Sequence, residues 1–188
     1  MLFRSLALKI DHSLWAWGNN DFGQCGFGPD DVTPNRVGAG NDWVAVAASG
    51  DTDPFSGTHS MGLRSDGSLW AWGKNDWGEL GFDTIGLPSV PTRVGVETNW
   101  ASIAAGCADS FARKRDGSLW AWGILTGFGS VPITMGTTYD WWEFAVGGSA
   151  ALSPPFATAI KTDGSLWRWA PGNPPLQVGT QTNWGSPP

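Results

Sequence analysis

Hydrophobic residues occur along this chain in short runs that are separated by Gly, Pro and Asp. In the run 69–72, Leu69 and Ala71 alternate with Trp70 and Trp72, and alternate residues of a strand point to opposite faces. Neither face of such a strand is polar, which predicts a strand that is covered on both sides by other sheets. Similar runs occur at residues 14–17, 119–122 and 166–169.

These runs belong to a sequence repeat. Each follows an Asp and a Ser, in the segments 11–18, 66–73, 116–123 and 163–170. The four Asp residues are 55, 50 and 47 residues apart, and a period of roughly 40–50 residues with a strand hairpin in each unit suits a propeller blade. We therefore expect an all-β fold: a β-propeller of four blade-like repeats with short antiparallel strands, forming a partial or small propeller.

The repeats fill the chain and leave no room for a second domain, so residues 1–188 are expected to form a single repeat domain. The approximate repeats are 1–50, 51–106, 107–148 and 149–188. A strand that ends in a basic residue precedes each Asp, at 5–9, 60–64, 110–114 and 157–161.

A tight turn is expected between the first two strands of each repeat. Asp followed by Gly is the strongest short hairpin signal, and it predicts a two-residue type I′ turn at Gly67, Gly117 and Gly164. His12 stands where the first repeat lacks this Gly, so that hairpin is expected to be strained or to use another turn.

Two further strands complete the expected unit. A third strand follows a Pro (34–37, 91–94, 132–135 and 175–178), which fits an edge position. A fourth begins at a Trp (43–47, 100–104 and 142–146) and is rich in small residues, which suits the innermost strand near a propeller axis. In repeat four, Trp184 is followed by Gly and Pro instead of a strand. Three inner strands for four repeats predict an arc of a longer ring, or a piece that another molecule completes.

Composition narrows the choice of partners. The formal net charge is −6 and no basic stripe exists, so direct nucleic-acid binding is not expected. No run approaches the ~20 apolar residues of a membrane span. The N-terminal apolar run is broken by Arg4 and Lys9, and is interpreted as a strand and not a signal peptide; the compartment stays open. Cys25 and Cys107 occupy different places in their repeats, so unpaired thiols are favoured over a disulfide.

The repeat resembles the regulator of chromosome condensation repeat family. The matching features are the D-G-S-L-W-A-W-G core, the N-D-W-G-E-L-G-F segment at 75–82, the P-x-R-V-G strand and the W-x-x-I-A-A-G strand. Repeat two carries all of them, whereas repeats three and four lack the N-D-x-G segment. The resemblance implies a β-propeller, typically of seven four-stranded blades, that binds other proteins on a loop face.

The family implies no single activity, because its members include a nucleotide-exchange factor for a small GTPase, ubiquitin-ligase modules and a secreted bacterial inhibitor. The W-A-W-G style is similar to bacterial and environmental members.

No catalytic or cofactor site emerges from the sequence. Only His12 and His59 are present, and no nucleophile, base and orienting group can be combined from them, so the chain is interpreted as non-enzymatic. Asp51, Asp53 and His59 are the best candidates for a Ca²⁺ site, but the remaining ligands of the known loop pattern are missing, and solvated loop acids are favoured. No metal or cofactor is expected.

The Asp residues at the hairpins (Asp11, Asp66, Asp116 and Asp163) are explained by turn chemistry and not by a metal. The repeated Trp residues are either packing between blades or a sugar-stacking platform, and strict repetition favours packing. They are Trp15, Trp17, Trp70, Trp72, Trp120, Trp122, Trp167 and Trp169.

The best binding candidates are unrepeated or protruding residues, because loops carry function on rigid scaffolds. Two loops present an aromatic residue beside an acid, Asp21 with Phe22 and Asp76 with Trp77. The insertion at 51–56 adds the candidates Asp51, Asp53 and Phe55. The competing interpretation is that Phe22 and Trp77 tuck under the neighbouring blade.

The sequence thus predicts a non-catalytic protein-binding scaffold that uses its loop faces. One alternative is an assembly subunit that a partner chain completes or that self-associates through an open blade edge. A second alternative is a carbohydrate-binding, lectin-like module.

Overall fold

The computed structural model describes residues 4–28, 31–50, 58–83, 87–123, 127, 129–149, 153–169 and 173–185. Within these ranges the chain contains strands and turns, and none of it forms a helix that could cross a membrane. The fifteen strands are β1 Ser5–Leu8, β2 Leu14–Gly18, β3 Asp31–Arg36, β4 Trp43–Ala48, β5 His59–Arg64, β6 Leu69–Gly73, β7 Thr92–Arg93, β8 Trp100–Ala105, β9 Asp109–Lys114, β10 Leu119–Gly123, β11 Gly129–Thr134, β12 Trp141–Ser149, β13 Ser153–Lys161, β14 Leu166–Trp169 and β15 Leu176–Gln177.

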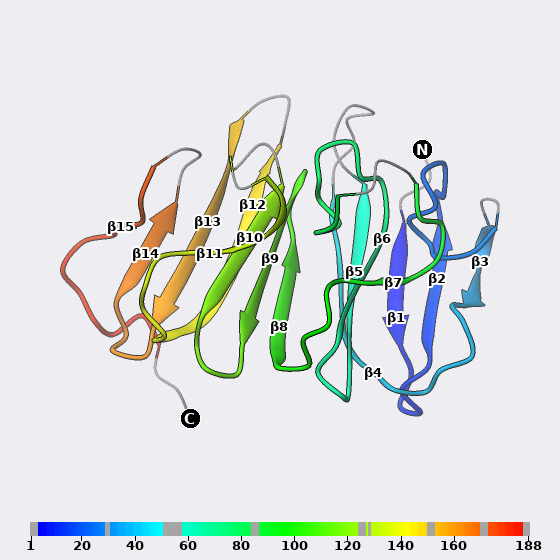
Figure 1. Cartoon of the computed structure of the whole chain (residues 1–188), viewed down its shortest axis with the longest axis horizontal. Helices are drawn as coiled ribbons and strands as arrows, with labels where there is room; N and C mark the ends of the chain where they lie inside the picture. The colour runs from blue at the N-terminus through cyan, green and yellow to red at the C-terminus, as the bar shows by residue number, and fades with distance from the viewer. Residues whose placement is uncertain are drawn as a thin grey trace.

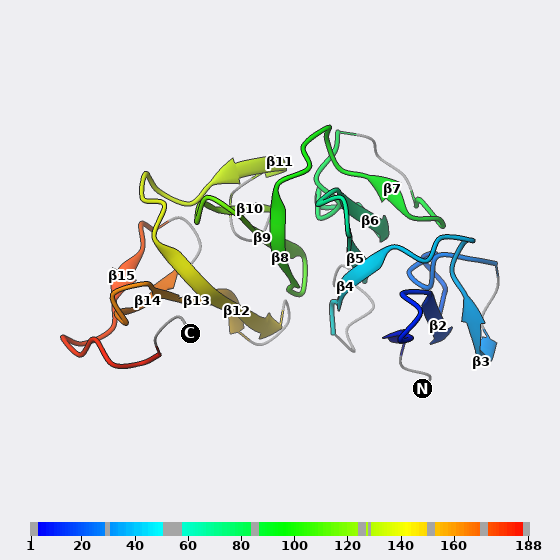
Figure 2. The same cartoon turned by 90° about the horizontal axis from the view of Figure 1, so that it is seen from below.

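The strands form four antiparallel sheets that follow one another along an arc (Figures 1 and 2). Three sheets have four strands, in the orders β4-β5-β6-β7, β8-β9-β10-β11 and β12-β13-β14-β15, and the described residues of the first give β1-β2-β3. β4, β8 and β12 lie on the inner side of the arc, and the short strands β7 and β15 lie at outer edges (Figure 2). The predicted all-β blade architecture is confirmed.

The strand that begins at a Trp was expected to start at Trp142 in repeat three, and this is wrong by one residue. Trp141 starts β12, and its N–H donates to the Gly117 carbonyl at 3.2 Å. Trp43 and Trp100 make the same bond to the preceding hairpin. Two adjacent Trp residues left the register ambiguous in sequence, and burial decides it, because Trp141 is buried whereas Trp142 is half-buried.

The expected type I′ turn is also wrong. Gly67 has a φ of 80°, but the preceding Asp66 does not have the positive φ that type I′ requires. The Gly67 N–H donates to the Arg64 carbonyl at 2.9 Å, and Arg64 pairs with Ser68 across the loop. This is a three-residue loop whose last residue is left-handed. His12 occupies that last position with a φ of 61°, which confirms the expected strain in the first hairpin.

The N-terminal run forms strand β1 at Ser5–Leu8, as expected. The third strand of each repeat lies at a sheet edge, also as expected, although Pro34 and Pro132 lie inside β3 and β11 and not at their starts. Both outer strands pair through a register shift, where a missing N–H is tolerated.

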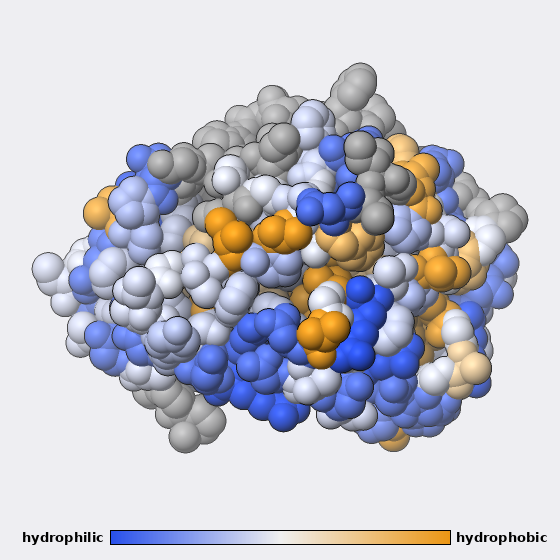
Figure 3. Space-filling view, in the orientation of Figure 1, coloured by the Kyte–Doolittle hydropathy of each residue, from blue (hydrophilic) through white to orange (hydrophobic). Residues whose placement is uncertain are grey.

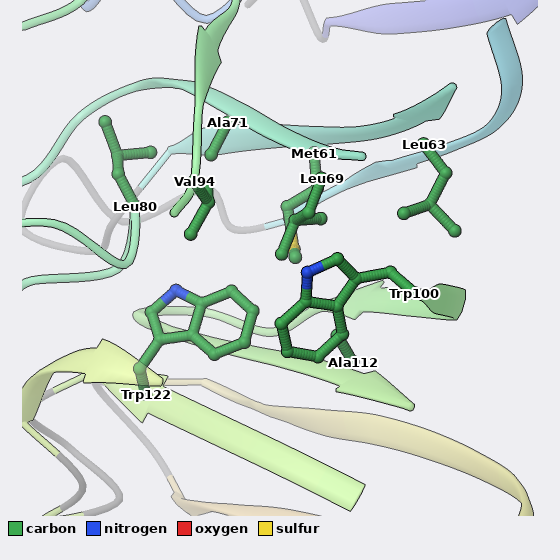
Figure 4. Packing of buried hydrophobic residues seen from close by; sticks show 9 residues of the cluster. All are labelled: Met61, Leu63, Leu69, Ala71, Leu80, Val94, Trp100, Ala112 and Trp122. Atoms are coloured by element: carbon green, nitrogen blue, oxygen red, sulfur yellow. The ribbon is translucent and has the colours of Figure 1, made fainter. Parts of the chain in front are cut away.

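The core consists of three layers between neighbouring sheets, each built in the same way. The face that carries Leu and Ala in one β-sheet packs against the Trp face of the next sheet. Between the second and third sheets, Leu69 and Ala71 meet Trp100 and Trp122, with Met61 beside them (Figure 4). A buried Trp removes on the order of 200 Å² from water, so these layers supply most of the stabilisation.

The two end faces of the stack differ from the layers inside it. Trp17, on the face of the first sheet that no described sheet covers, is half-buried, whereas its counterparts Trp72 and Trp122 are completely buried. At the other end, Arg168 is exposed at the place that a completely buried Ala occupies in the other three sheets. An exposed Arg gives that end face a polar surface.

Candidate functional site

Two loops of the same design follow β2 and β6. In each, one Asn side chain holds the two limbs together. Asn20 accepts from the Cys25 N–H at 2.7 Å and donates to the Phe27 carbonyl at 2.6 Å. Asn75 accepts from the Leu80 N–H at 2.9 Å and donates to the Phe82 carbonyl at 3.3 Å. Both Asn residues are buried, which makes each loop a fixed element.

Each loop is also bonded to the next sheet. The Gln24 carbonyl accepts from the Trp72 indole at 3.0 Å and from the Ser60 hydroxyl at 2.6 Å. The Glu79 carbonyl accepts from Trp122 at 2.9 Å and from Ser110 at 2.7 Å. The sequence shows the aromatic and Ser positions but not this partner, because a backbone acceptor leaves no signature.

The tips of the two loops lie side by side. The Lys74 ammonium is 5.0 Å from the centre of the Phe22 ring and 3.4 Å from the Asp76 carboxylate. Trp77, next to Asp76, has 40% of its surface exposed. We call Asp21, Phe22, Lys74, Asp76 and Trp77 the tip surface. Phe22 and Asp76 contact the buried Lys74, and their sequence neighbours Asp21 and Trp77 are exposed.

The tip surface contains four of the seven residues that the sequence singled out: Asp21, Phe22, Asp76 and Trp77. Phe22 is half-buried against Lys74, whereas Trp77 projects further because repeat three has no matching loop in sequence. Lys74 was missed, since a lone Lys in a loop carries no signal. Asp51, Asp53 and Phe55 lie outside the described residues.

Glu79 lies beneath the second tip and is completely buried. One carboxylate oxygen accepts from the Trp77 N–H at 2.8 Å. Burial raises the pKa of the Glu79 carboxyl from its ordinary value of 4.5 to about 7, and the Trp77 N–H and the Lys74 charge oppose this only in part. In the first loop Gln24 takes the same place, and its side-chain oxygen accepts a hydrogen bond from the Phe22 N–H at 2.8 Å. A neutral side chain therefore makes the same hydrogen bond as Glu79 does.

His59 and Ser110 form the one described contact that resembles catalytic machinery. The His59 Nε2 is 2.7 Å from the Ser110 hydroxyl. Ser110, however, donates its proton to the Glu79 carbonyl, and both residues are completely buried. A nucleophile must face substrate and give its proton to a base, and Ser110 does neither. The His59–Ser110 contact instead joins the second sheet to the third. The described residues also contain no cluster of three His, Cys, Asp or Glu suited to a metal.

The four hairpin Asp residues have the same structural role. In repeat three, Asp116 accepts from the Ser118 N–H at 2.9 Å and from its hydroxyl at 2.7 Å, and Ser118 accepts from the Trp120 indole at 2.9 Å. The Ser hydroxyl, and then the Ser N–H, hold the pKa of each Asp carboxyl below its ordinary value. This explains why Asp, Ser and Trp recur together.

The opposite end of the sheets carries a second repeated arrangement, which we call the cation–indole stack. Lys114 lies 4.7 Å from the Trp100 ring centre and 3.9 Å from that of Trp120, and it pairs with Glu97 at 2.7 Å. Arg64 and Lys161 make equivalent stacks in their sheets, with Asp42 and Asp140 as the acids. The basic position was visible in the sequence, but the second indole comes from the inner strand and was not foreseen.

These features define a class of protein: stacked four-stranded blades of the β-propeller type, fastened by loops and with no assembled reaction centre among the described residues. The family model of the regulator of chromosome condensation (RCC1) repeat matches residues 11–52 and 66–112. The chain therefore carries RCC1 repeats, which confirms the resemblance seen in the sequence.

Relatives and solved structures agree with this assignment. The chain is 38% identical over 106 residues to an X-linked retinitis pigmentosa GTPase regulator homolog of Caenorhabditis elegans, covering 55% of this chain and 7% of that protein. It is 34% identical over 116 residues to the human probable E3 ubiquitin-protein ligase HERC6, covering 57% of this chain and 11% of that protein. The chain thus spans a small part of these relatives.

The fold is similar to that of Prp20p from Saccharomyces cerevisiae, a protein studied for its binding to Gsp1p and histones. The TM-score is 0.76 at 19% identity, and the match covers 94% of this chain and 48% of Prp20p. At this identity the likeness shows the fold alone.

Proposed function

We propose that this chain is a non-catalytic, protein-binding propeller scaffold and that it binds its partner through the tip surface. The observation that carries the proposal is a pair of loops, each held by a buried Asn: Phe22 of the first loop lies against Lys74, and Trp77 of the second loop is exposed. Trp is enriched among the residues that dominate binding energy, and a preformed loop loses little entropy on binding.

The charges of the tip surface suggest the chemistry of the partner. Asp21 and Asp76 are exposed and the chain has a net charge of −6, so a segment with Lys or Arg beside an apolar side chain fits best. Binding by Prp20p to Gsp1p and histones shows that this fold serves as a protein-binding surface elsewhere. On the side seen in Figure 3, apolar residues form small scattered groups and offer no larger competing patch.

The lectin-like alternative receives less support. Among the described Trp residues, Trp77 and Trp184 are the exposed ones, with 40% and 50% of their surface accessible. They lie at opposite ends of the sheets, because Trp77 follows β6 whereas Trp184 bonds to a hairpin turn. Two rings so placed cannot stack on one sugar.

The test uses cross-linking pull-down with the chain 1–188 as bait. Trp77→Ala and Phe22→Ala are expected to lower recovery of the partner at least tenfold, because each removes an aromatic anchor. Tyr139→Ala is the matched control, since Tyr139 is an exposed aromatic residue at the opposite end and its loss should change nothing. Equal recovery by all variants would refute the tip surface as the binding site.

A further inference from the structure

The two loops of the tip surface differ at one pair of equivalent positions. In the first loop, Asn19 accepts a hydrogen bond from the Gln24 amide and donates one to the Asp21 carboxylate at 2.7 Å. Lys74 and Glu79 stand at the places of Asn19 and Gln24 in the second loop. One neutral amide therefore serves two partners in the first loop, whereas the second loop has one cation and two acids at the same places.

The cation of the second loop pairs with only one of its two acids. The Lys74 ammonium is 3.4 Å from the Asp76 carboxylate and 5.0 Å from the centre of the Phe22 ring. The Oε2 of Glu79 accepts from the Trp77 N–H at 2.8 Å, but its Oε1 is buried with no hydrogen-bond partner among the described residues. A completely buried carboxylate without a counter-ion is unfavourable, so this arrangement fits a protonated Glu79.

The charges of the loop act on Glu79 in a consistent way. Burial raises the pKa of the Glu79 carboxyl to about 7, and the Asp76 charge also raises this pKa, whereas the Trp77 N–H and the Lys74 charge lower it. Lys74 is therefore coupled to both acids. Asp83, at the end of the loop, instead accepts a hydrogen bond from a Ser hydroxyl of β11.

Two further titratable side chains belong to the sheets that pack against this loop. His59 of β5 contacts the Ser110 hydroxyl, which donates to the Glu79 carbonyl, and Asp109 precedes Ser110 in β9. β10 contributes the Trp122 indole, which does not titrate. A test must therefore separate the titration of Glu79 from that of His59, because an ordinary His changes charge at a similar pH.

We propose that Lys74 exchanges between Asp76 and Glu79 as the pH changes, and that this exchange regulates the tip surface. When Glu79 is protonated, Lys74 pairs with Asp76 and lies against Phe22, as in the structure. When Glu79 loses its proton to solvent, Lys74 turns inward to the new carboxylate on its flexible stem, and releases both Asp76 and the Phe22 ring.

The effect on binding rests on the proposed function of the tip surface. A released Asp76 makes this surface more acidic, so a basic segment binds more tightly at higher pH. The first loop does not respond, since neither Asn19 nor Gln24 carries a charge.

The exchange is tested without a partner, by NMR of the chain 1–188 between about pH 5.5 and 8.5. The ring signals of Phe22 and the ε-methylene signals of Lys74 should shift together, with the same midpoint as the carboxyl carbon of Glu79. Glu79→Gln should remove this midpoint, whereas a titration of His59 would persist in that variant.

Lys74→Asn is the matched variant, because it gives the second loop the side chain that the first loop has at this place. Glu79 should then titrate without a change in the Phe22 ring signals. The midpoint of Glu79 should also move to higher pH, because the Lys74 charge that lowers its pKa is absent. A purely structural role of Lys74 would leave that midpoint where it is.

A dye-labelled peptide of alternating Arg and Leu measures the effect on binding by fluorescence anisotropy. The wild-type chain should bind it about threefold more tightly at pH 8 than at pH 6, and Glu79→Gln equally at both. Asp76→Asn should lower binding at pH 8 to its value at pH 6. If the peptide binds at neither pH while the shared midpoint is present, the proposed function is contradicted and the exchange is supported.

Two results overturn the exchange. One is that the Phe22 and Lys74 signals stay constant while Glu79 titrates. The other is that their shared midpoint persists in Glu79→Gln, which would assign it to His59.

Discussion

Ser118 connects the Asp116 carboxylate to the Trp120 indole, two groups that are close in sequence but whose interaction the sequence does not show. Its hydroxyl accepts a hydrogen bond from the Trp120 indole N–H and donates one to the Asp116 carboxylate. The role of Asp in the turn could be predicted from local chemistry, but the relay to Trp could not, because it depends on the ring turning back along the strand. The same holds for Lys74 and Phe22, which are 52 residues apart in sequence and are brought together only by packing of two loops.

Glu79 yields a prediction about pH. Its pKa is raised on folding, so its contribution to stability is complete below pH 4.5 and is lost as pH rises towards about 7. A rise from 4.5 to about 7 corresponds to about 3 kcal/mol at most. Glu79→Gln should therefore unfold at higher denaturant concentration than the wild type at pH 8, and the two should differ little at pH 4.5.

The control for this prediction is Gln24→Ala in the matching loop, which should lower stability by a similar amount at both pH values, because no charge is involved. The four hairpin Asp carboxyls act in the opposite sense, since their pKa values are lowered and their contribution is lost only as pH falls below about 4. A wild-type curve that is flat between pH 5 and 8 would contradict the role given to Glu79.

The hairpin is the element that sequence predicted best in position and worst in detail. Asp-Gly located the turns of repeats two, three and four. The turn nevertheless has three residues, because the strands remain paired to Arg64 and Ser68 and leave Ser65, Asp66 and Gly67 between them. A left-handed residue is needed only at the last position. The sequence could not show this, since both turn types favour Gly at that place.

Gly117 has a second requirement besides its φ of 84°. A Cβ there would lie 2.1 Å from the Tyr139 carbonyl oxygen, in the segment that leads into the next sheet. Gly136 has the same φ of 84° and nothing within 4 Å of a Cβ. Gly136→Ala should cost about 1 kcal/mol from backbone strain alone, and Gly117→Ala considerably more, on the order of 4 kcal/mol, measured by urea denaturation.

Equal losses for the two variants would show that the close approach of the Tyr139 carbonyl contributes nothing. The comparison therefore separates the strain within one turn from the contact between two consecutive blades.

At the scale of the whole molecule, the sequence repeats produce the row of similar sheets. The faces of the first and last sheets differ from those that are packed between sheets. The alternation of Leu and Ala with Trp correctly predicted that β6 and β10 are covered on both sides, whereas β2 and β14 each have one face that no described sheet covers. The alternation could not show which sheets pack against each other, because the same pattern is compatible with any order of stacking. Counting inner strands predicted three of them for four repeats but did not show which sheet lacks one. Among the described residues it is the sheet β1-β2-β3, where Lys9 lies against Trp15.

Ala71 and Arg168 occupy equivalent places in their sheets, but substitutions at the two positions are expected to change stability by very different amounts. Ala71→Arg would force a charge into the layer beside Trp122 and should destabilise the chain by more than about 4 kcal/mol, with loss of the cooperative transition. Arg168→Ala should change stability by less than about 0.5 kcal/mol, because that side chain is exposed. Circular dichroism during guanidinium unfolding measures both, and a mild Ala71→Arg effect would mean that the layers are looser than described.

The contact of a Leu and Ala face with a Trp face has a direction, since the two surfaces are unlike and each meets only the other. Neighbouring sheets in the arc are therefore joined by the same kind of contact. A duplicated unit inserted between any two sheets would have a complementary face on each of its sides. Growth or shortening by whole units thus needs no compensating change elsewhere. Insertion or loss of a unit changes how far the arc extends around its axis. It also changes which loop tips are neighbours.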